Sequence, residues 1–240
     1  MSTFSMLLFG LLLGMKHATD ADHLAAMATL SSGQNSLAQT IRQGVAWGVG
    51  HTLTLMLIGG IALWLGAAIP PKTAQALEFA VGLMLMMLGV DVWRRLAKQQ
   101  IHVHVHSHDQ NLKHVHAHSH LGPQTSECSA HSHGHPDKPP LRALFIGMMH
   151  GLAGSAALIA LSLGVESSWF MGLLYIAIFG IGSIVGMALL SAVITVPLGW
   201  SARSPGWLHE GLPLGIGGFS CLLGVFVVYR IGVVEGLLFN

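Results

Sequence analysis

Residues 3–31 read TFSMLLFGLLLGMKHATDADHLAAMATLS, an apolar stretch with a charged and polar run, Lys16–His23, near its centre. A membrane-spanning helix needs about 20 consecutive apolar residues, so the stretch is long enough to form one. One charged side chain near the bilayer centre costs about 2.5–3.5 kcal/mol on insertion scales. Two carboxylates, two imidazoles and an ammonium group at that depth therefore predict a functional site inside the first span.

The composition of the whole chain indicates the same class of protein. Of 240 residues, 52% are hydrophobic and only 9% charged, and the mean hydropathy is +0.62, whereas a soluble domain carries about 25% charged residues. We expect an all-α polytopic membrane protein with six spans, at about 3–31, 44–68, 75–96, 141–164, 169–198 and 211–237. This composition excludes a soluble enzyme, a DNA-binding protein and a disulfide-stapled secreted domain. With a net charge of +1, the chain also offers no large basic surface for nucleic acid.

The basic residues near the span ends predict the orientation, because cytoplasmic loops carry an excess of Lys and Arg. The first, third and fifth loops hold Arg42, Arg94, Arg95, Lys98, Arg142 and Arg203, whereas the opposite side offers Lys72 and Arg230. We therefore place these three loops in the cytoplasm and both termini outside. The expected location is the bacterial cytoplasmic (inner) membrane, as a multi-pass protein.

Three short segments recur in the same order in the two halves of the chain. The pairs are 14–17 with 147–150, 47–51 with 179–183, and 88–90 with 223–225, at offsets of 133, 132 and 135 residues. Chance is the alternative, because Gly and Leu are common here. A duplicated unit of three spans must insert its two copies in opposite directions, and this inverted repeat is typical of secondary transporters. The predicted organisation is residues 1–100 as the first repeat, 101–140 as a His-rich cytoplasmic linker and 141–240 as the second repeat.

The polar run in the first span has the ligand chemistry of a divalent cation site. Imidazole and carboxylate together suit first-row ions such as Ni²⁺, Co²⁺ or Zn²⁺. In one regular helix, His17, Asp20 and His23 would share an arc of about 120° and Asp22 would point elsewhere. A distorted helix would recruit Asp22 directly. Two structural alternatives remain: a turn that ends the first span near residue 15, and an ion pair between Lys16 and Asp20.

Two further histidines lie in predicted spans. His51 follows Gly48-Val49-Gly50, where small residues allow neighbouring helices to approach closely. His150 is the repeat mate of His17. Asp91 could serve ions or pair with Arg94 or Arg95. The predicted metal-binding residues are His17, Asp20, Asp22, His23, His51 and His150.

Residues 17–23 form an H-x4-D-H pattern. With Gly14 and Lys16 before it, the segment resembles the signature helix of the nickel/cobalt transporter (NiCoT) family, and is most similar to the shorter, urease-associated UreH-like members. The Gly50-His51-Thr52 segment is similar to that family's Gly-His-Ser/Thr element. The resemblance implies a secondary permease for Ni²⁺ and Co²⁺ in which His17, Asp22 and His23 are essential. Typical members carry this motif on the second of eight spans, whereas here it falls on the first of six.

Residues 101–138 hold most of the chain's 16 histidines: His102, His104, His106, His108, His114, His116, His118, His120, His131, His133 and His135. The segment is polar and contains Pro and Ser, so we expect it to be disordered. Neutral imidazoles bind Ni²⁺, Co²⁺, Zn²⁺ and Cu²⁺ near pH 7. The predicted role is an accessory metal-binding loop, and the alternative is a spacer between the repeats.

These features predict secondary-active transport of nickel or cobalt, as uptake that supplies urease or hydrogenase maturation. No phosphate-binding GxxxxGK[ST] motif is present, so an ion gradient, the membrane potential or a partner must supply the energy. We expect no enzymatic activity and no tightly bound cofactor, with Ni²⁺ or Co²⁺ as the transported substrate. The partners expected are the ions, the lipid bilayer and a cytosolic metallochaperone. The alternatives are metal efflux, a membrane-bound metal donor that does not transport, and an intramembrane metalloenzyme, which the absence of HExxH disfavours.

Overall fold

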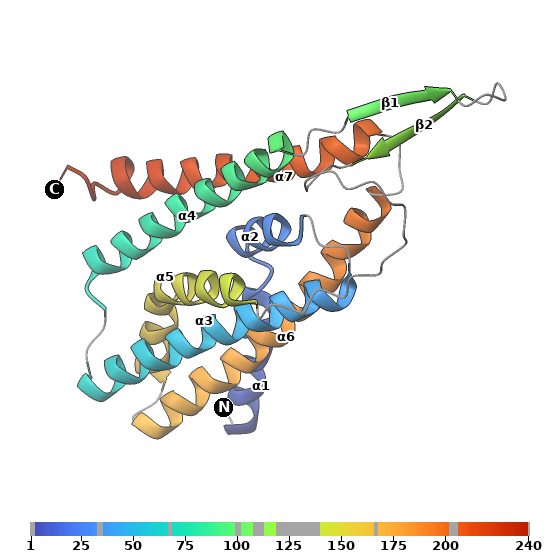
Figure 1. Ribbon diagram of the computed structural model, residues 1–240. Coiled ribbons are helices and arrows are strands. Elements are labelled where there is room, and N and C mark those ends of the chain that lie inside the picture. Colours follow the sequence, from blue (N-terminus) through green and yellow to red (C-terminus); the bar gives the residue numbers. More distant parts are fainter. Residues whose placement is uncertain are drawn as a thin grey trace.

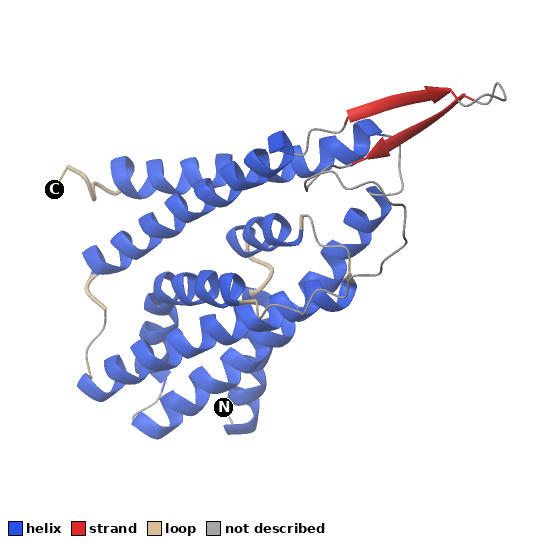
Figure 2. Cartoon of the chain, viewed as in Figure 1, coloured by secondary structure: helices blue, strands red, loops and turns tan. Residues whose placement is uncertain are grey.

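A computed structural model describes residues 3–32, 36–66, 69–98, 102–107, 113–118, 140–165, 168–201 and 206–239. Its helices are α1 Thr3–His17, α2 Ala21–Ser31, α3 Leu37–Leu65, α4 Pro71–Lys98, α5 Leu141–Val165, α6 Trp169–Ser201, α7 Gly206–Tyr229 and the π-helix η1 Arg230–Val234 (Figure 1). The strands are β1 His102–Ser107 and β2 Lys113–His118. Figure 2 shows that the regular structure is otherwise helical, as predicted.

Among the described residues, four helices have the length and apolar composition needed to cross a membrane: Leu37–Leu65, Pro71–Ala97, Trp169–Trp200 and Gly211–Val234. They correspond to four of the six predicted spans. Phe4–His17 and Leu141–Gly154 form shorter apolar helices. The apolar helices direct large side chains outward; for example, Leu57 is 62% exposed and Val196 and Leu222 are each 72% exposed. Apolar surface of this extent is unusual on a water-soluble monomer and suits hydrocarbon surroundings.

The first predicted span is not a single helix. Of the two alternatives left open for it, the regular helix over 3–31 is wrong, and the distorted one that recruits Asp22 is the arrangement found. Helix α1 ends at His17, and α2 begins after Asp20, whose backbone is extended (φ −63°, ψ 150°). In the turn, the Thr19 hydroxyl donates to the Lys16 carbonyl at 2.6 Å. Thr and Asp side chains compete with the helical backbone for its hydrogen bonds and favour helix ends, which accounts for the break.

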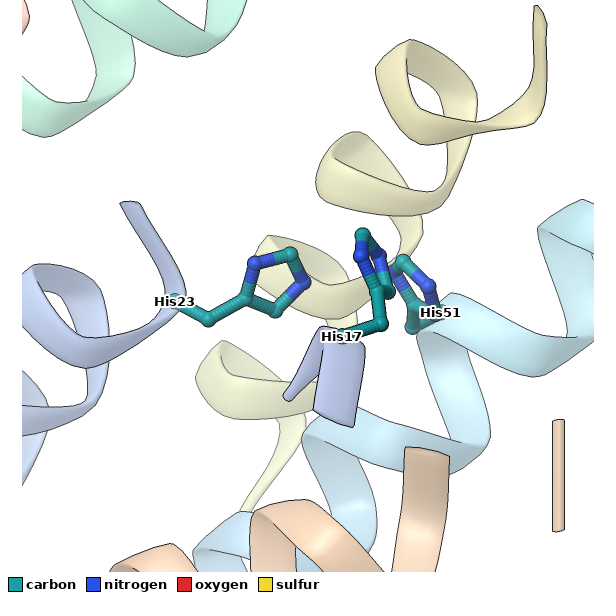
Figure 3. Close-up of side chains that lie close together, drawn as sticks. All are labelled: His17, His23 and His51. Carbon is teal, nitrogen blue, oxygen red and sulfur yellow. The ribbon is translucent and has the colours of Figure 1, made fainter. Parts of the chain in front are cut away.

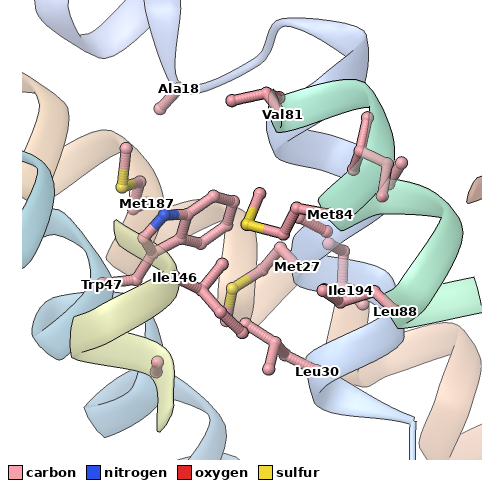
Figure 4. Packing of buried hydrophobic residues seen from close by; sticks show 14 residues of the cluster. Ala18, Met27, Leu30, Trp47, Val81, Met84, Leu88, Ile146, Met187 and Ile194 are labelled. Atoms are coloured by element: carbon pink, nitrogen blue, oxygen red, sulfur yellow. The ribbon is translucent and has the colours of Figure 1, made fainter. Parts of the chain in front are cut away.

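The helices form two groups that meet at α2. Helices α4 and α7 pack against each other, while α3 packs on α5 and α6, and α1 packs on α6 (Figure 1). Helix α2 lies between these groups and contacts α4, α6 and α7. Buried apolar side chains from both groups fill the contact around α2, with Trp47 fully buried beside Met27 and Met187 (Figure 4). The residues that begin α2 are therefore held in the centre of the molecule.

Two segments of the linker form regular structure, which was not expected. Strands β1 and β2 pair antiparallel, with register from His102↔His118 to Ser107↔Lys113. The expectation of disorder is therefore wrong for these two segments. In 102–107 histidine alternates with valine, which is the two-residue period of a strand, and Val has high β-propensity. His108, His120, His131, His133 and His135 lie outside the described residues, as does Cys128.

Candidate metal centre

Five of the six predicted ligands come together at the start of α2. His17 ends α1, Asp22 and His23 lie in the first turn of α2, His51 lies in α3 and His150 in α5. Figure 3 shows the rings of His17, His23 and His51 gathered from three helices. In each of two groups, His17/His23/His51 and Asp22/His23/His150, the candidate ligand atoms lie within 4.8 Å of one another. His23 belongs to both groups, so the two are contiguous.

The four imidazoles are closely spaced and deeply placed. Ring centroids are 4.6 Å apart for His17 and His23 and 4.7 Å apart for His23 and His150. The His51 ring lies 5.4 Å from both His17 and His23. His51 is fully buried, and His23 and His150 are each only 2% exposed. Three of these rings are therefore removed from solvent.

Several ring nitrogens of these buried histidines have no hydrogen-bond partner in the described part of the chain. They are His23 Nε2 and both nitrogens of His51 and of His150. His150 Nε2 lies 3.4 Å from Asp22 Oδ2, which is ion-pair distance but longer than a well-formed hydrogen bond. An unsatisfied buried polar group costs about 1–3 kcal/mol. The cluster therefore has the unmet bonding capacity that a bound cation would satisfy.

Each of the two carboxylates in the polar run holds a neighbouring histidine. His17 Nδ1 donates to Asp20 Oδ2 at 2.9 Å, and His23 Nδ1 donates to Asp22 Oδ1 at 3.1 Å. A carboxylate on Nδ1 fixes the ring and leaves Nε2 available to a metal, as in carboxylate–histidine–metal arrangements. Asp22 therefore both orients His23 and faces His150.

The structure does not bring Asp20 into either group of candidate ligands. Its carboxylate also pairs with Lys16 Nζ at 3.5 Å, and it is 39% exposed. The shared arc expected for His17, Asp20 and His23 required an unbroken helix. Because the helix breaks after His17, Asp20 lies outside both groups and contacts His17 Nδ1. Asp22 instead lies among the candidate ligands, with His23 and His150.

Glycines on α5 allow that helix to approach the cluster. A Cβ added at Gly151 would lie 2.5 Å from the His51 carbonyl oxygen, so no larger residue fits there without a shift. A Cβ at Gly154 would lie 3.6 Å from His17 Nε2 and 3.8 Å from His51 Cε1. The space beside Gly154 is thus bounded by two of the candidate ligands.

Trp47 is a further part of the site that was not among the predicted residues. Its ring stacks on His23, with centroids 5.4 Å apart and planes at 15°, and it meets His150 edge-on at 5.3 Å. Trp47 lies four residues before His51, a spacing that places both on one helix face. This four-residue spacing could have identified Trp47 from the sequence. Trp47 fixes the orientation of two candidate ligands from one side.

A cavity of about 180 Å³ adjoins the cluster. His17, Asp22, His23 and His150 line it together with Ala153 and Gly154, and its other lining residues are Glu78, Val81, Val227, Arg230 and Ile231. Glu78 was not among the predicted site residues, although a carboxylate in an apolar span is a recognisable signal.

Asp91 belongs to a separate ion-pair network. Its carboxylate pairs with Arg142 at 2.6 Å and with Arg95 at 3.4 Å. Arg95 also donates to the carbonyls of Thr29 and Ser32, at 3.2 and 3.1 Å. The alternative in which Asp91 pairs with arginine is therefore the arrangement found, and the network ties α2, α4 and α5 together.

Helices of membrane-spanning length around a buried imidazole–carboxylate cluster define a helical membrane protein with a candidate transition-metal centre. The chain is 35% identical over 240 residues to urease accessory protein UreH of Bacillus sp. (strain TB-90), a match covering 97% of this chain and 94% of the relative. The chain therefore belongs to the UreH family, and the resemblance to short NiCoT-like members is confirmed. That relative is named as an accessory protein, not as an enzyme. No protein-family model matches the chain, and no solved structure matches it.

Proposed function

We propose that the protein carries Ni²⁺ or Co²⁺ across a membrane by secondary transport, and binds the ion at the His17/Asp22/His23/His51/His150 cluster. The observation that carries this proposal is the set of unpartnered ring nitrogens on buried His23, His51 and His150. Imidazole with carboxylate suits nickel and cobalt, whereas Mg²⁺ and Ca²⁺ prefer oxygen ligands alone.

The broken first span supports transport rather than static storage. The carboxyl end of α1 and the amino end of α2 meet at the cluster. Discontinuous helices whose ends face the substrate are typical of secondary transporters. The carbonyl end of α1 favours a cation, and the amino end of α2 favours the Asp22 carboxylate.

The packing also supports an inverted repeat of six spans, with α1 and α2 as one broken span and α5 as its mate. Helix α1 packs on α6, as α5 packs on α3. Gly14 of α1 abuts the Phe179 carbonyl, and its mate Gly147 of α5 abuts the carbonyl of Trp47, the mate of Phe179. Exchange of the two halves therefore reproduces the same contacts, as expected for a two-fold related duplication.

We infer that transport is uptake and that it supplies nickel for urease assembly. The relative's name, a urease accessory protein, favours this use. The same name also favours a second candidate function, a membrane-bound metal donor that hands nickel on without transporting it.

Nickel flux into proteoliposomes, followed with an enclosed metal-sensitive dye, tests the proposal. The variants are His17→Ala and His51→Ala, and Leu57→Ala is the control because it lies on α3 with His51 but is 62% exposed. We expect flux in the wild type and in Leu57→Ala, and none in the histidine variants. Wild-type protein that binds nickel without flux would establish the donor function. Equal flux in His51→Ala and wild type would refute the site.

Cells separate the two directions of transport. At matched expression, uptake predicts more nickel per cell with the wild type than with His17→Ala. Less nickel with the wild type would establish efflux.

A further inference from the structure

We propose that the cavity beside the cluster is the ion's access path and that Glu78 is an outer cation-binding residue at its mouth. The inference rests on the proposed metal site, and it adds a residue and an entry side that the site itself does not specify.

The cavity joins buried ligands to an exposed carboxylate. On one side it is lined by His23 and His150, each 2% exposed and each with an unpartnered ring nitrogen. Val81 and Ile231, 5% and 1% exposed, are buried parts of its wall. Glu78 lines the same cavity and is exposed. The cavity therefore connects the cluster with the surface at Glu78.

Glu78 carries a negative charge that no cation neutralises by direct pairing in the described part of the chain. Arg230, the nearby cationic wall residue, pairs instead with Glu235 at 2.9 Å, and Gln75 donates to the other oxygen of Glu235 at 3.3 Å. An acidic group at the mouth of a low-dielectric cleft raises the local concentration of cations. Because imidazole holds nickel and cobalt better than a lone carboxylate does, the ion would pass inward from Glu78.

The Asp91 network lies at the opposite end of α4. Arg142 and Arg95 pair with Asp91, and Arg95 also holds the end of α2. Glu78 and Arg95 are 17 residues apart on α4, or about 25 Å at 1.5 Å per residue. The basic residues of the network belong to the loops assigned to the cytoplasm. In this conformation the path therefore opens to the outside.

Thiol labelling tests the path independently of transport. Val81→Cys and Met84→Cys are made with Cys128→Ser and Cys221→Ser, and intact cells are treated with a charged, membrane-impermeant methanethiosulfonate. Val81 and Met84 are similarly buried, at 5% and 7%, but of the two only Val81 is among the cavity-lining residues. We expect labelling at Val81→Cys, protection by Ni²⁺, no labelling at Met84→Cys, and loss of protection with His51→Ala. No labelling at Val81→Cys, or equal labelling at both positions, overturns the path.

Transport kinetics test Glu78. In Glu78→Gln we expect KM for Ni²⁺ to rise about tenfold with kcat unchanged, because the lost charge lowers ion capture and leaves the inner cluster intact. Glu78→Asp keeps the negative charge, so its KM should stay close to that of the wild type. An unchanged KM in Glu78→Gln overturns the role of Glu78 while the transport proposal stands. If Val81→Cys is labelled and protected by nickel but the wild-type protein shows no flux, transport is refuted and the path stands.

Discussion

Asp22 Oδ2 lies 3.4 Å from His150 Nε2, so a carboxylate in the first half of the chain faces an imidazole in the second half. The other oxygen of Asp22 accepts the hydrogen bond from His23 Nδ1 at 3.1 Å. One side chain thus connects α2 with α5 at the candidate metal centre. A relative movement of the two halves would separate the ligands on either side of Asp22.

Asp22→Asn should lower nickel affinity about 10–100-fold, the usual cost of removing a carboxylate that orients a metal-binding histidine. The neutral amide lacks the charge that holds both rings. Isothermal titration of the purified protein measures the effect. Asp20→Asn is the matched control: among the imidazoles of the described residues, Asp20 contacts only His17, and it is 39% exposed, so the loss should be smaller. An equal or larger loss in Asp20→Asn would contradict the assignment.

Nickel binding should weaken when the medium is made acidic, because an imidazole binds a metal only when it is neutral. Protons therefore compete with the ion, and binding releases protons. Titrations in two buffers of different ionisation enthalpy give the number released. An affinity that stays constant however acidic the medium, with the protein still folded, would count against imidazole ligation.

Gly50→Ala should destabilise the fold by about 1–3 kcal/mol, the usual cost of overpacking a close contact. The added methyl group would meet the Leu144 carbonyl. If the two halves are true repeats, Gly182→Ala should have a similar effect, because a Cβ there meets the carbonyl of Leu11, the mate of Leu144. Thermal unfolding in detergent measures both.

Gly199→Ala is the control for these variants. Among the described residues, nothing lies within 4 Å of a Cβ at Gly199, and alanine is the better helix former by about 1 kcal/mol. Its melting temperature should therefore stay constant or rise. A fall as large as that of Gly50→Ala would contradict the steric explanation.

Arg95→Ala should destabilise the protein, because the guanidinium holds two carbonyls at the end of α2 and charged hydrogen bonds contribute about 1.5–3 kcal/mol. Arg95→Lys should not rescue it, since an ammonium group lacks the planar fork that reaches both carbonyls. Arg94→Ala serves as the control at an exposed neighbour. Thermal unfolding of the three variants is the measurement, and equal effects at residues 94 and 95 would refute the argument.

Replacement of residues 101–138 by a short Gly-Ser linker should lower the nickel bound per protein, because the segment carries most of the histidines. Flux at saturating nickel should persist, since the buried cluster lies outside this segment. Metal analysis after dialysis counts the bound ions. An unchanged number would remove the segment from metal binding.

The helical class and the long spans follow from the sequence because the free energy of moving a segment out of water is the sum of the contributions of its side chains. Runs of apolar residues therefore predicted the positions of α3, α4, α6 and α7 to within several residues. The same reasoning identified the polar run in the first span, since charges there are too costly to be incidental. The chemistry of the side chains alone was enough to predict His17, His23 and His51 as metal ligands.

The tertiary structure decided which of these groups meet. Because the helix breaks after His17, Asp22 joins the candidate ligands and Asp20 does not. Hydropathy did not reveal that the chain forms a turn at Thr19. His150 lies 127 residues from His23, and only the packing of α5 on α3 brings it to the cluster. The Trp47 stack and the Glu78 cavity likewise join separate helices. A helix rotated by one residue would turn each of these side chains by about 100°, so their meeting depends on packing between distant segments and not on local composition.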